Sequence, residues 1–289
     1  MSHTQAEVES QPEIWTRVLG APAELPEAGC NVLGLGCGTS YYVMDSYARR
    51  RQALGQGRTR AAIASELADE DPYDVAVLLS RSGTTTDLLP LAERLSERMT
   101  TIAITGTPGS PITRVTHRQV VLDFADEVSV VQTRFATSAL LLLRASLGED
   151  LGGLPGEAAT ALAEPLAAEP AEVDHVVFLG TGWTLGLAGE AALKLREAAK
   201  FWTESYAVGE YRHGPIACAG PRSLVWSLAP LPPDVAAAVR DTGARLRVAS
   251  GDPLAELVRV HRLAVAFARY RGLNCDSPEH LTRSVIVDA

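Results

Sequence analysis

A stretch dense in hydroxyl groups is the strongest candidate for chemistry in this 289-residue chain. The turn Ser80–Thr85, with the sequence SRSGTT, follows the apolar run Val75–Leu79 and precedes the helix-like segment Asp87–Arg98. A helix that starts directly after such a turn offers unpaired backbone N–H groups and the positive end of its dipole to an anion. We therefore predict a phosphate site here, although the hydroxyls could instead only cap the helix. The candidate ligands are Ser80, Ser82, Gly83, Thr84 and Thr85.

A second hydroxyl-bearing turn, CGTS, contributes Thr39 and Ser40 after the apolar run that begins at Asn31. Ligands of parallel sheets bind beyond the carboxyl ends of the strands, so both turns should lie at the same edge. The dinucleotide fingerprint Gly-x-Gly-x-x-Gly fails, because the sixth position counted from Gly34 is Thr39. We therefore predict no NAD site.

The second half of the chain carries ionisable residues at helical spacing. Glu190, Lys194 and Glu197 stand at i, i+4 and i+7, which places them on one face of a helix. The simpler interpretation is a solvated face with one Glu–Lys pair, worth roughly a few tenths of a kcal/mol. His213 stands beside a Gly-Pro pair in the polar stretch Glu204–Pro215, and a lone histidine of this kind indicates little by itself.

The chain divides into two related halves. The segments Asn31–Ser40 and Asp174–Thr184 both join an apolar run to a glycine-rich turn, and aligning them places Gly36 on Gly180. Strand candidates alternating with helix-like segments predict an α/β fold of two doubly wound parallel sheets. The other strand candidates are Val75–Leu79, Thr101–Thr105, Gln119–Leu122, Leu224–Leu228 and Ala244–Ala249.

Apolar spacing predicts further helices at Glu7–Leu19 and Pro253–Tyr270. The stretch Leu147–Pro170 is rich in Gly, Pro, Ala and acids but keeps some helical character, so it is the expected linker. The domain boundary should therefore fall between residues 151 and 152.

Composition narrows the possible partners. The formal charge of −9 lacks the basic footprint of a nucleic-acid-binding protein, so we expect no nucleic-acid partner. Apolar runs are far shorter than the ~20 residues of a membrane helix, which predicts no membrane association. The polar N-terminal stretch does not resemble a secretory signal, so a cytoplasmic location is expected. The four cysteines show no metal-ligand spacing and are interpreted as buried thiols.

Together the motifs resemble those of the sugar isomerase (SIS) domain family. The likeness is strongest to the isomerase half of glucosamine-6-phosphate synthase and to the related phosphosugar isomerases and amino-sugar-phosphate deaminases. It runs in order along nearly the whole chain. It is carried by CGTS at Cys37–Ser40, SRSGTT at Ser80–Thr85, VVQTR at Val130–Arg134, EAALKLRE at Glu190–Glu197, ESYAVGEYRHGP at Glu204–Pro215 and HLTRSVIVD at His280–Asp288.

The resemblance implies two flavodoxin-like SIS domains in tandem. Residues 1–151 would form the first, phosphate-binding domain with its N-terminal helix, and residues 152–289 the second, with the catalytic glutamate helix and the C-terminal tail. It further implies a homodimer with its sites at the subunit interface and a sugar 6-phosphate as ligand. From the residues themselves we expect no cofactor and no metal.

The resemblance also implies roles for single residues. Ser80, Ser82 and Thr85 match phosphate ligands, with Thr39 and Ser40 nearby. Glu197 matches the base that moves a proton between C1 and C2, and His213 matches the group that assists ring opening from the other subunit. Such a proton transfer passes through an enediol and needs a carboxylate of this kind. Lys194 would hold a substrate oxygen or merely neutralise Glu190.

Three departures from the synthase set the expected activity. Arg283 stands where the synthase carries a Schiff-base lysine, and a guanidinium cannot become the neutral amine of imine formation. Gln132 replaces a phosphate-binding serine, and the glutamine-hydrolysing domain is missing, so we expect no use of glutamine ammonia. These changes favour a phosphosugar isomerase or an amino-sugar-6-phosphate deaminase. A non-catalytic phosphosugar-binding regulatory protein is the alternative.

Overall fold

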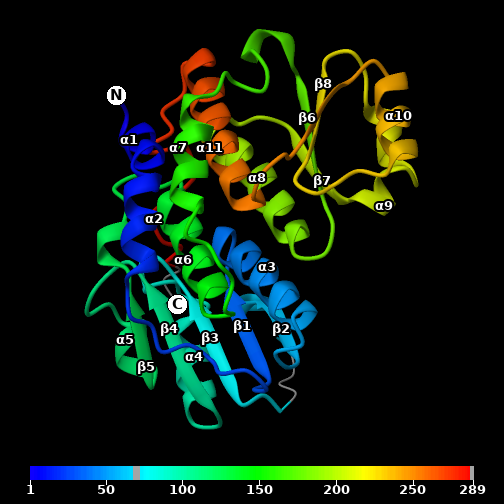
Figure 1. Ribbon diagram of the computed structural model, residues 1–289. Coiled ribbons are helices and arrows are strands. Elements are labelled where there is room, and N and C mark those ends of the chain that lie inside the picture. Colours follow the sequence, from blue (N-terminus) through cyan, green and yellow to red (C-terminus); the bar gives the residue numbers. More distant parts are fainter. Residues whose placement is uncertain (68–71, 287–289) are drawn as a thin grey trace. The chain divides into compact units, whose positions relative to one another are not determined.

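The computed structural model describes residues 1–67 and 72–286, which form two compact units (Figure 1). The five-stranded unit comprises Glu13–Val128, Gln132–Gly152 and the C-terminal residues from Thr282. The four-stranded unit comprises Met1–Pro12, Ser129–Val131 and Gly153–Leu281. The two ends of the chain are thus exchanged between units, whereas the predicted division at residues 151 and 152 assumed continuous halves. Val287 and Asp288 of the terminal motif lie outside the described residues.

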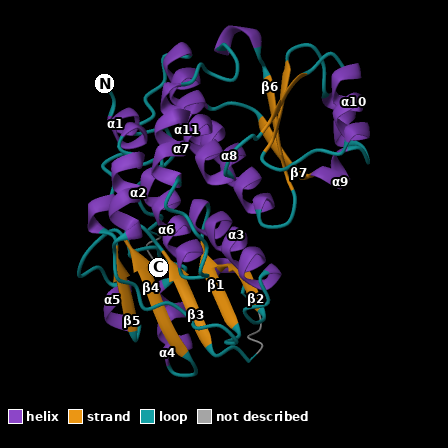
Figure 2. Cartoon of the chain, in the orientation of Figure 1, coloured by secondary structure: helices purple, strands orange, loops and turns teal. Residues whose placement is uncertain are grey.

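The five-stranded unit is built on a parallel sheet of order β2-β1-β3-β4-β5 (Figure 2). Helices α4 and α5 cover one face, where Leu88, Leu91 and Leu95 pack against Leu33 and Leu78. Helices α3 and α6 pack together and α3 lies against β1. The strands are β1 (Val32–Gly36), β2 (Thr59–Ile63), β3 (Val75–Leu79), β4 (Thr100–Thr105) and β5 (Arg118–Val121). The helices are α2 (Gln11–Leu19), α3 (Thr39–Ala53), α4 (Leu89–Ser96), α5 (Ile112–Val115) and α6 (Arg134–Ala145).

The four-stranded unit has a parallel sheet of order β7-β6-β8-β9. Helix α8 packs against β6, β7 and α11, while α1 and α7 pack on α11. Tyr211 of α9 and Val235 of α10 join Val177 and Val225 in a core on the sheet. The strands are β6 (His175–Gly180), β7 (Thr203–Ala207), β8 (Ser223–Ser227) and β9 (Arg245–Val248). The helices are α1 (His3–Glu9), α7 (Leu154–Ala163), α8 (Thr184–Ala199), α9 (Val208–Tyr211), α10 (Pro233–Asp241) and α11 (Pro253–Tyr270).

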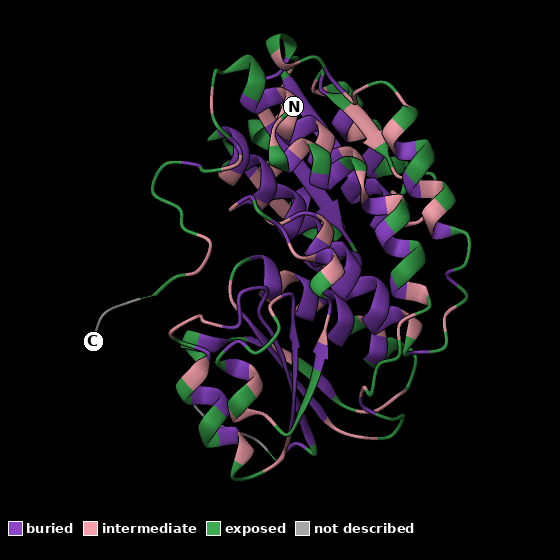
Figure 3. Ribbon diagram, turned by 90° about the vertical axis from the view of Figure 1, so that its left-hand side faces the viewer, coloured by how far each residue is buried: buried purple, intermediate pink, exposed green. Residues whose placement is uncertain are grey.

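The predicted α/β fold with two parallel sheets is confirmed. The central strands β1, β3 and β8 are buried along their whole length, and their apolar runs were recognised in the sequence. In Figure 3 most of the strand residues have the colour of buried residues. Strands β2 and β7 were missed. Both are edge strands with polar, partly exposed residues, so neither carries the continuous apolar run of a buried strand.

Two local predictions were wrong. The N-terminal segment forms two helices rather than one, because α1 ends at Glu9 and α2 begins at Gln11 with Pro12 in its first turn, the place where a helix tolerates a proline. The thiols are not uniformly buried. Cys275 is buried, Cys30 and Cys37 are half-buried, and Cys218 is exposed on the short turn after α9. No helix among the described residues is long and apolar enough to cross a membrane.

Candidate functional site

A small hollow lies where β3 ends in the five-stranded unit. Its volume is about 40 Å³. Ser80, Ser82 and Thr85 of the SRSGTT turn line it, together with Ser40 at the start of α3. Two turns far apart in sequence therefore meet, because β1 and β3 are neighbours in the sheet and both end at this edge. The other lining residues are Cys37, Leu79, Arg81, Leu88, Gln132 and Arg283.

The hydroxyls of the turn bond to one another and to the turn's own backbone. Ser80 Oγ accepts from the Gly83 N–H at 3.1 Å and lies 3.3 Å from Thr85 Oγ1. Ser82 Oγ accepts from both the backbone N–H of Thr84 at 3.3 Å and its hydroxyl at 3.0 Å. Helix α4 begins later than expected, at Leu89, and Leu88 at its N-cap makes no side-chain cap. Capping of that helix is therefore not the role of these hydroxyls.

Gly83 lets the turn close on the following loop. Its φ of +64° is a conformation that residues with a side chain rarely adopt, and a Cβ there would lie only 2.2 Å from Ser110 Oγ. Any larger residue would therefore push the turn and the Ser110 loop apart.

A buried ion pair supports the turn from behind. The Arg81 guanidinium lies 3.5 Å from Glu127, and both side chains are almost completely buried. Glu127 Oε1 also accepts hydrogen bonds from the backbone N–H groups of Thr133 and Arg134, at 2.6 and 2.9 Å. Glu127 thus connects the SRSGTT turn to the start of α6, next to Gln132. The side-chain oxygen of Gln132 is buried without a hydrogen-bond partner among the described residues, so this amide can turn toward a ligand in the hollow.

The C-terminal tail binds the same turn. Arg283 makes a bidentate pair with the Asp126 carboxylate, at 2.5 and 2.7 Å, and donates to the backbone oxygen of Glu127. Thr84 donates to Ser284 Oγ at 2.9 Å, and the Thr86 N–H donates to the backbone oxygen of Val285 at 3.1 Å. Arg283 is therefore held beside the hollow as a fixed cation.

The helix face predicted in the second half exists, but it is not solvated. Lys194 Nζ lies 2.5 Å from Glu197 and 3.6 Å from Glu190. The side chains of Lys194 and Glu190 are buried, since α11 packs on α8, whereas that of Glu197 is 21% exposed. Lys194 thus compensates the charge of Glu190 inside the four-stranded unit and orients Glu197 toward its surface.

Glu197 borders a larger hollow of about 600 Å³ in the four-stranded unit. Trp202, which follows the end of α8, lines this hollow and is 77% exposed. Lys200 and Glu279, which also line the hollow, form an ion pair with each other. The remaining lining residues are Leu193, Arg196, Phe201, Thr203, His280 and Leu281. A carboxylate beside a concave surface of this size has the setting of a proton-transfer group.

The remaining predicted site residues do not line either hollow. Thr39, Gly83 and Thr84 are next in sequence to residues that line the hollow at the end of β3, but they do not line it themselves. His213 is exposed in the turn after α9, where its backbone N–H donates to the oxygen of Glu210 at 2.9 Å. Within the described residues, no group of three or more His, Cys, Asp or Glu could hold a metal ion.

Sequence reasoning missed several residues of both hollows. Arg81 belongs to the SRSGTT motif, and this position could have identified it. Only the other five residues of the motif were predicted as ligands. Asp126 and Glu127 precede the VVQTR motif, yet only the fold brings them to Arg283 and Arg81. Trp202 beside Glu197 carried no recognisable signal, because an isolated tryptophan after a helix is more often part of a core.

The comparison with protein families agrees with the hydroxyl-lined turns. Residues 25–147, which include both turns and Gln132, match the family described as the SIS domain. The similarity to the SIS domain is thus limited to this region. The matched region lies almost wholly in the five-stranded unit, with the phosphate-site candidates in the turns after β1 and β3.

Relatives of known sequence or structure extend over both units. The chain is 27% identical to a glutamine–fructose-6-phosphate aminotransferase (isomerizing) from Xylella fastidiosa, over 94% of this chain and 54% of that protein. It thus spans about half the length of that relative. The crystal structure of a glucosamine-6-phosphate deaminase from Thermotoga maritima matches with a TM-score of 0.85 and 25% identity, covering 99% of this chain and 100% of that chain. The C-terminal domain of the Francisella tularensis aminotransferase shares the fold at 21% identity and a TM-score of 0.81, covering 96% of this chain and 98% of that chain.

Proposed function

We propose that the chain is an enzyme acting on a hexose 6-phosphate, either as an aldose–ketose isomerase or as an amino-sugar-6-phosphate deaminase. The observation that carries this proposal is the hollow at the end of β3. Hydroxyl-bearing residues from two turns line it together with Gln132, whose buried side-chain oxygen has no hydrogen-bond partner among the described residues. Ser40, Ser80, Ser82 and Thr85 would donate to the phosphate oxygens, and Gln132 would add its amide group.

Arg283 supplies the positive charge of this phosphate site. Its guanidinium is paired with Asp126, so it is held in place as a hydrogen-bond donor and cannot form an imine. Arg81 is buried and would position the other residues of the site, because it pairs with Glu127 and donates to the backbone oxygen of Arg283. Binding would be strongest for the dianionic phosphate, because charged acceptors make stronger hydrogen bonds.

Glu197 is the proposed base. In an aldose it would remove the proton from C2 and return it to C1, passing through the enediol and leaving a ketone at C2. With an amine at C2, the same transfer gives a C2 imine, and water then releases ammonia and leaves the ketose. Lys194 holds the Glu197 carboxylate in place, and His213 would protonate the ring oxygen as the sugar opens.

We further propose that the four-stranded unit is a second SIS domain, as in a tandem repeat whose two domains correspond to residues 1–151 and 152–289 apart from the exchanged segments Met1–Pro12, Ser129–Val131 and the residues from Thr282. The strand order β7-β6-β8-β9 repeats the order β2-β1-β3-β4 of the first sheet. The turns after β1 and β6 also match, because each has a glycine packed closely against the helix that follows. A Cβ on Gly36 would lie 2.6 Å from the Ser40 backbone, and a Cβ on Gly180 would lie 2.4 Å from the Thr184 backbone. We propose a cytoplasmic homodimer in which His213 reaches the site of the other subunit.

The test is an assay of the purified chain with the 6-phosphates of glucose, fructose, glucosamine and galactosamine, following both ammonia and the keto product. Ammonia release identifies a deaminase, and interconversion without ammonia identifies an isomerase. Glu197→Gln should bind the same sugar phosphate but turn it over at least a thousandfold more slowly, whereas the control Glu172→Gln, at an exposed ion pair, should match the unmodified chain. Binding without turnover of any of these sugars would reject the enzyme in favour of a regulatory sugar-phosphate-binding protein.

A further inference from the structure

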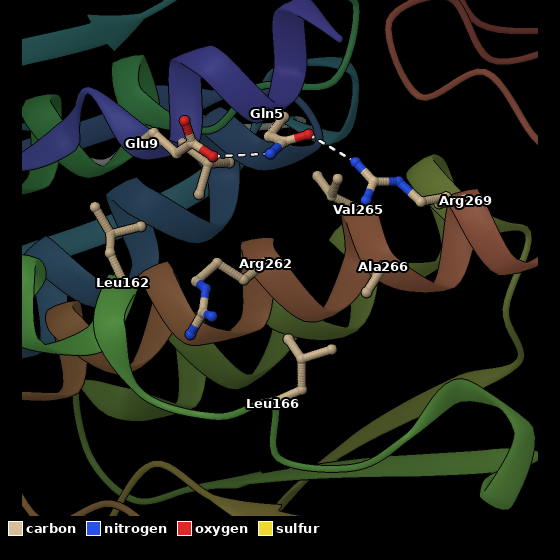
Figure 4. Close-up of a pocket in the computed structure, with 9 residues that line it drawn as sticks. Gln5, Glu9, Leu162, Leu166, Arg262, Val265, Ala266 and Arg269 are labelled. Carbon is tan, nitrogen blue, oxygen red and sulfur yellow. Dashed lines mark hydrogen bonds between the residues drawn. The ribbon is translucent and has the colours of Figure 1, made fainter. Parts of the chain in front are cut away.

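A third hollow, remote in sequence from the residues discussed above, lies among α1, α7 and α11 of the four-stranded unit (Figure 4). Its volume is about 460 Å³, which is within the range of small-molecule sites in proteins. The walls are mainly apolar. They comprise the buried Val8 and four partly buried residues, Leu162, Leu166, Val265 and Ala266.

Two guanidinium groups face this apolar surface. Arg262 Nη1 donates to the backbone oxygens of Ala161 and Glu164, both at 2.7 Å, so one nitrogen of this side chain is fully used. Its Nε and Nη2 have no hydrogen-bond partner among the described residues. Burial also lowers the pKa of Arg262, as expected for a cation whose surroundings compensate its charge incompletely.

Among the residues that line the hollow, positive charge exceeds negative charge. Arg269 donates to Gln5 Oε1 at 2.8 Å, and Gln5 in turn donates to Glu9 Oε1 at 2.8 Å, as the dashed lines in Figure 4 show. Glu9 is the single acidic residue in the lining and is exposed at its edge. Two cations therefore stand against one carboxylate that already has a hydrogen-bond donor.

We propose that this hollow binds a small amphipathic carboxylate, with its hydrocarbon part against the apolar walls and its carboxylate on Arg262, while the exposed Arg269 adds positive charge to the lining. The free Nε and Nη2 of Arg262 form the planar pair of donors that suits a carboxylate. A sugar phosphate would fit poorly, because its hydroxyls would find no partners on these walls. This site is separate from the proposed catalytic function and does not depend on it.

The test uses the fluorescent probe 1-anilinonaphthalene-8-sulfonate, an aromatic anion, with octanoate, octan-1-ol and inorganic phosphate as competitors. Octanoate should displace the probe, octan-1-ol should need at least tenfold higher concentration, and phosphate should have no effect. Lengthening the carboxylate from hexanoate to octanoate should tighten binding by about fourfold per methylene group.

Two variants locate the binding. Ala266→Trp fills the hollow and should weaken probe binding at least tenfold, while Ala238→Trp, on the partly exposed side of α10, should not change it. Arg262→Lys keeps a donor for the two backbone oxygens but loses the planar pair, and should weaken octanoate binding about tenfold. The control Arg240→Lys, at an exposed arginine of α10, should have no effect. Equal competition by octan-1-ol, or unchanged probe binding in Ala266→Trp, would overturn the proposal.

Discussion

Lys194 and Glu197 lie one turn apart on α8 and are joined by a hydrogen bond of 2.5 Å, yet only the lysine is buried. The lysine ammonium sits between the exposed end of Glu197 and the buried carboxylate of Glu190. A buried cation with two carboxylates on the same helix face fixes the direction in which the outer one points. This arrangement suits the proton transfer that we propose for Glu197, because the orientation of its carboxylate does not depend on the solvent.

Replacing Lys194 by Met should destabilise the protein by about 3–5 kcal/mol, because it leaves Glu190 buried without its cation. Chemical denaturation at pH 7 measures this loss. The double variant Lys194→Met/Glu190→Gln removes the uncompensated charge and should recover at least half of the lost stability. A Lys194→Met protein as stable as the unmodified chain would show that the pair contributes nothing to folding.

Thr85 lines the hollow that we propose as the phosphate site, and Thr84 does not. Thr85→Val should therefore raise KM for the sugar 6-phosphate about tenfold or more, the effect of losing one hydrogen bond to a charged group. Thr84→Val loses only bonds to Ser82 and Ser284 and should change KM less. Steady-state kinetics on the two variants measures both changes in KM. An equal rise in KM for Thr84→Val and Thr85→Val would contradict the proposal that Thr85, and not Thr84, binds the phosphate.

His261 on α11 makes the stability of the fold sensitive to acid. Burial and the nearby charge of Lys194 lower its pKa from 6.5 to about 3. Between about pH 3 and pH 6.5 the imidazole is protonated in the unfolded chain and neutral in the folded chain. The free energy of unfolding is therefore highest above pH 6.5 and decreases as the pH falls below that value. From pH 7 to pH 5 the loss is about 2 kcal/mol, at roughly 1.4 kcal/mol per pH unit below 6.5.

Denaturation curves at pH 7 and pH 5 measure this effect. His261→Leu should be less sensitive to acid than the unmodified chain by that amount, whatever its stability at pH 7. If the two proteins lost the same free energy of unfolding between these pH values, His261 would not be neutral in the folded state.

The four thiols should react with Ellman's reagent at different rates. Cys218 is exposed and should react first, whereas Cys275 is buried and should react only on unfolding. Burial raises the pKa of Cys37, with a smaller contribution from Asp87, so its thiolate fraction and its reaction rate should be low. Cys218→Ser should remove the fast phase and Cys275→Ser should keep it. A fast phase that survives Cys218→Ser would contradict this order.

The local patterns of the sequence predicted much of the chemistry. An apolar run followed by a glycine- and hydroxyl-rich turn located the strands β1 and β3, and with them Ser40, Ser80, Ser82 and Thr85. The i, i+4, i+7 spacing placed Glu190, Lys194 and Glu197 on one helix face. These features depend on the period of a strand or a helix, which a short stretch of residues sets by itself.

Only the tertiary structure decided which of these residues are buried and what they meet. The helix face of Lys194 could equally have been solvated, and packing of α11 on α8 buried it. Arg283 reaches Asp126, 157 positions earlier, because the tail returns to the five-stranded unit. Burial and pairing between distant segments arise from the packing of whole elements, and no local spacing in the sequence encodes them.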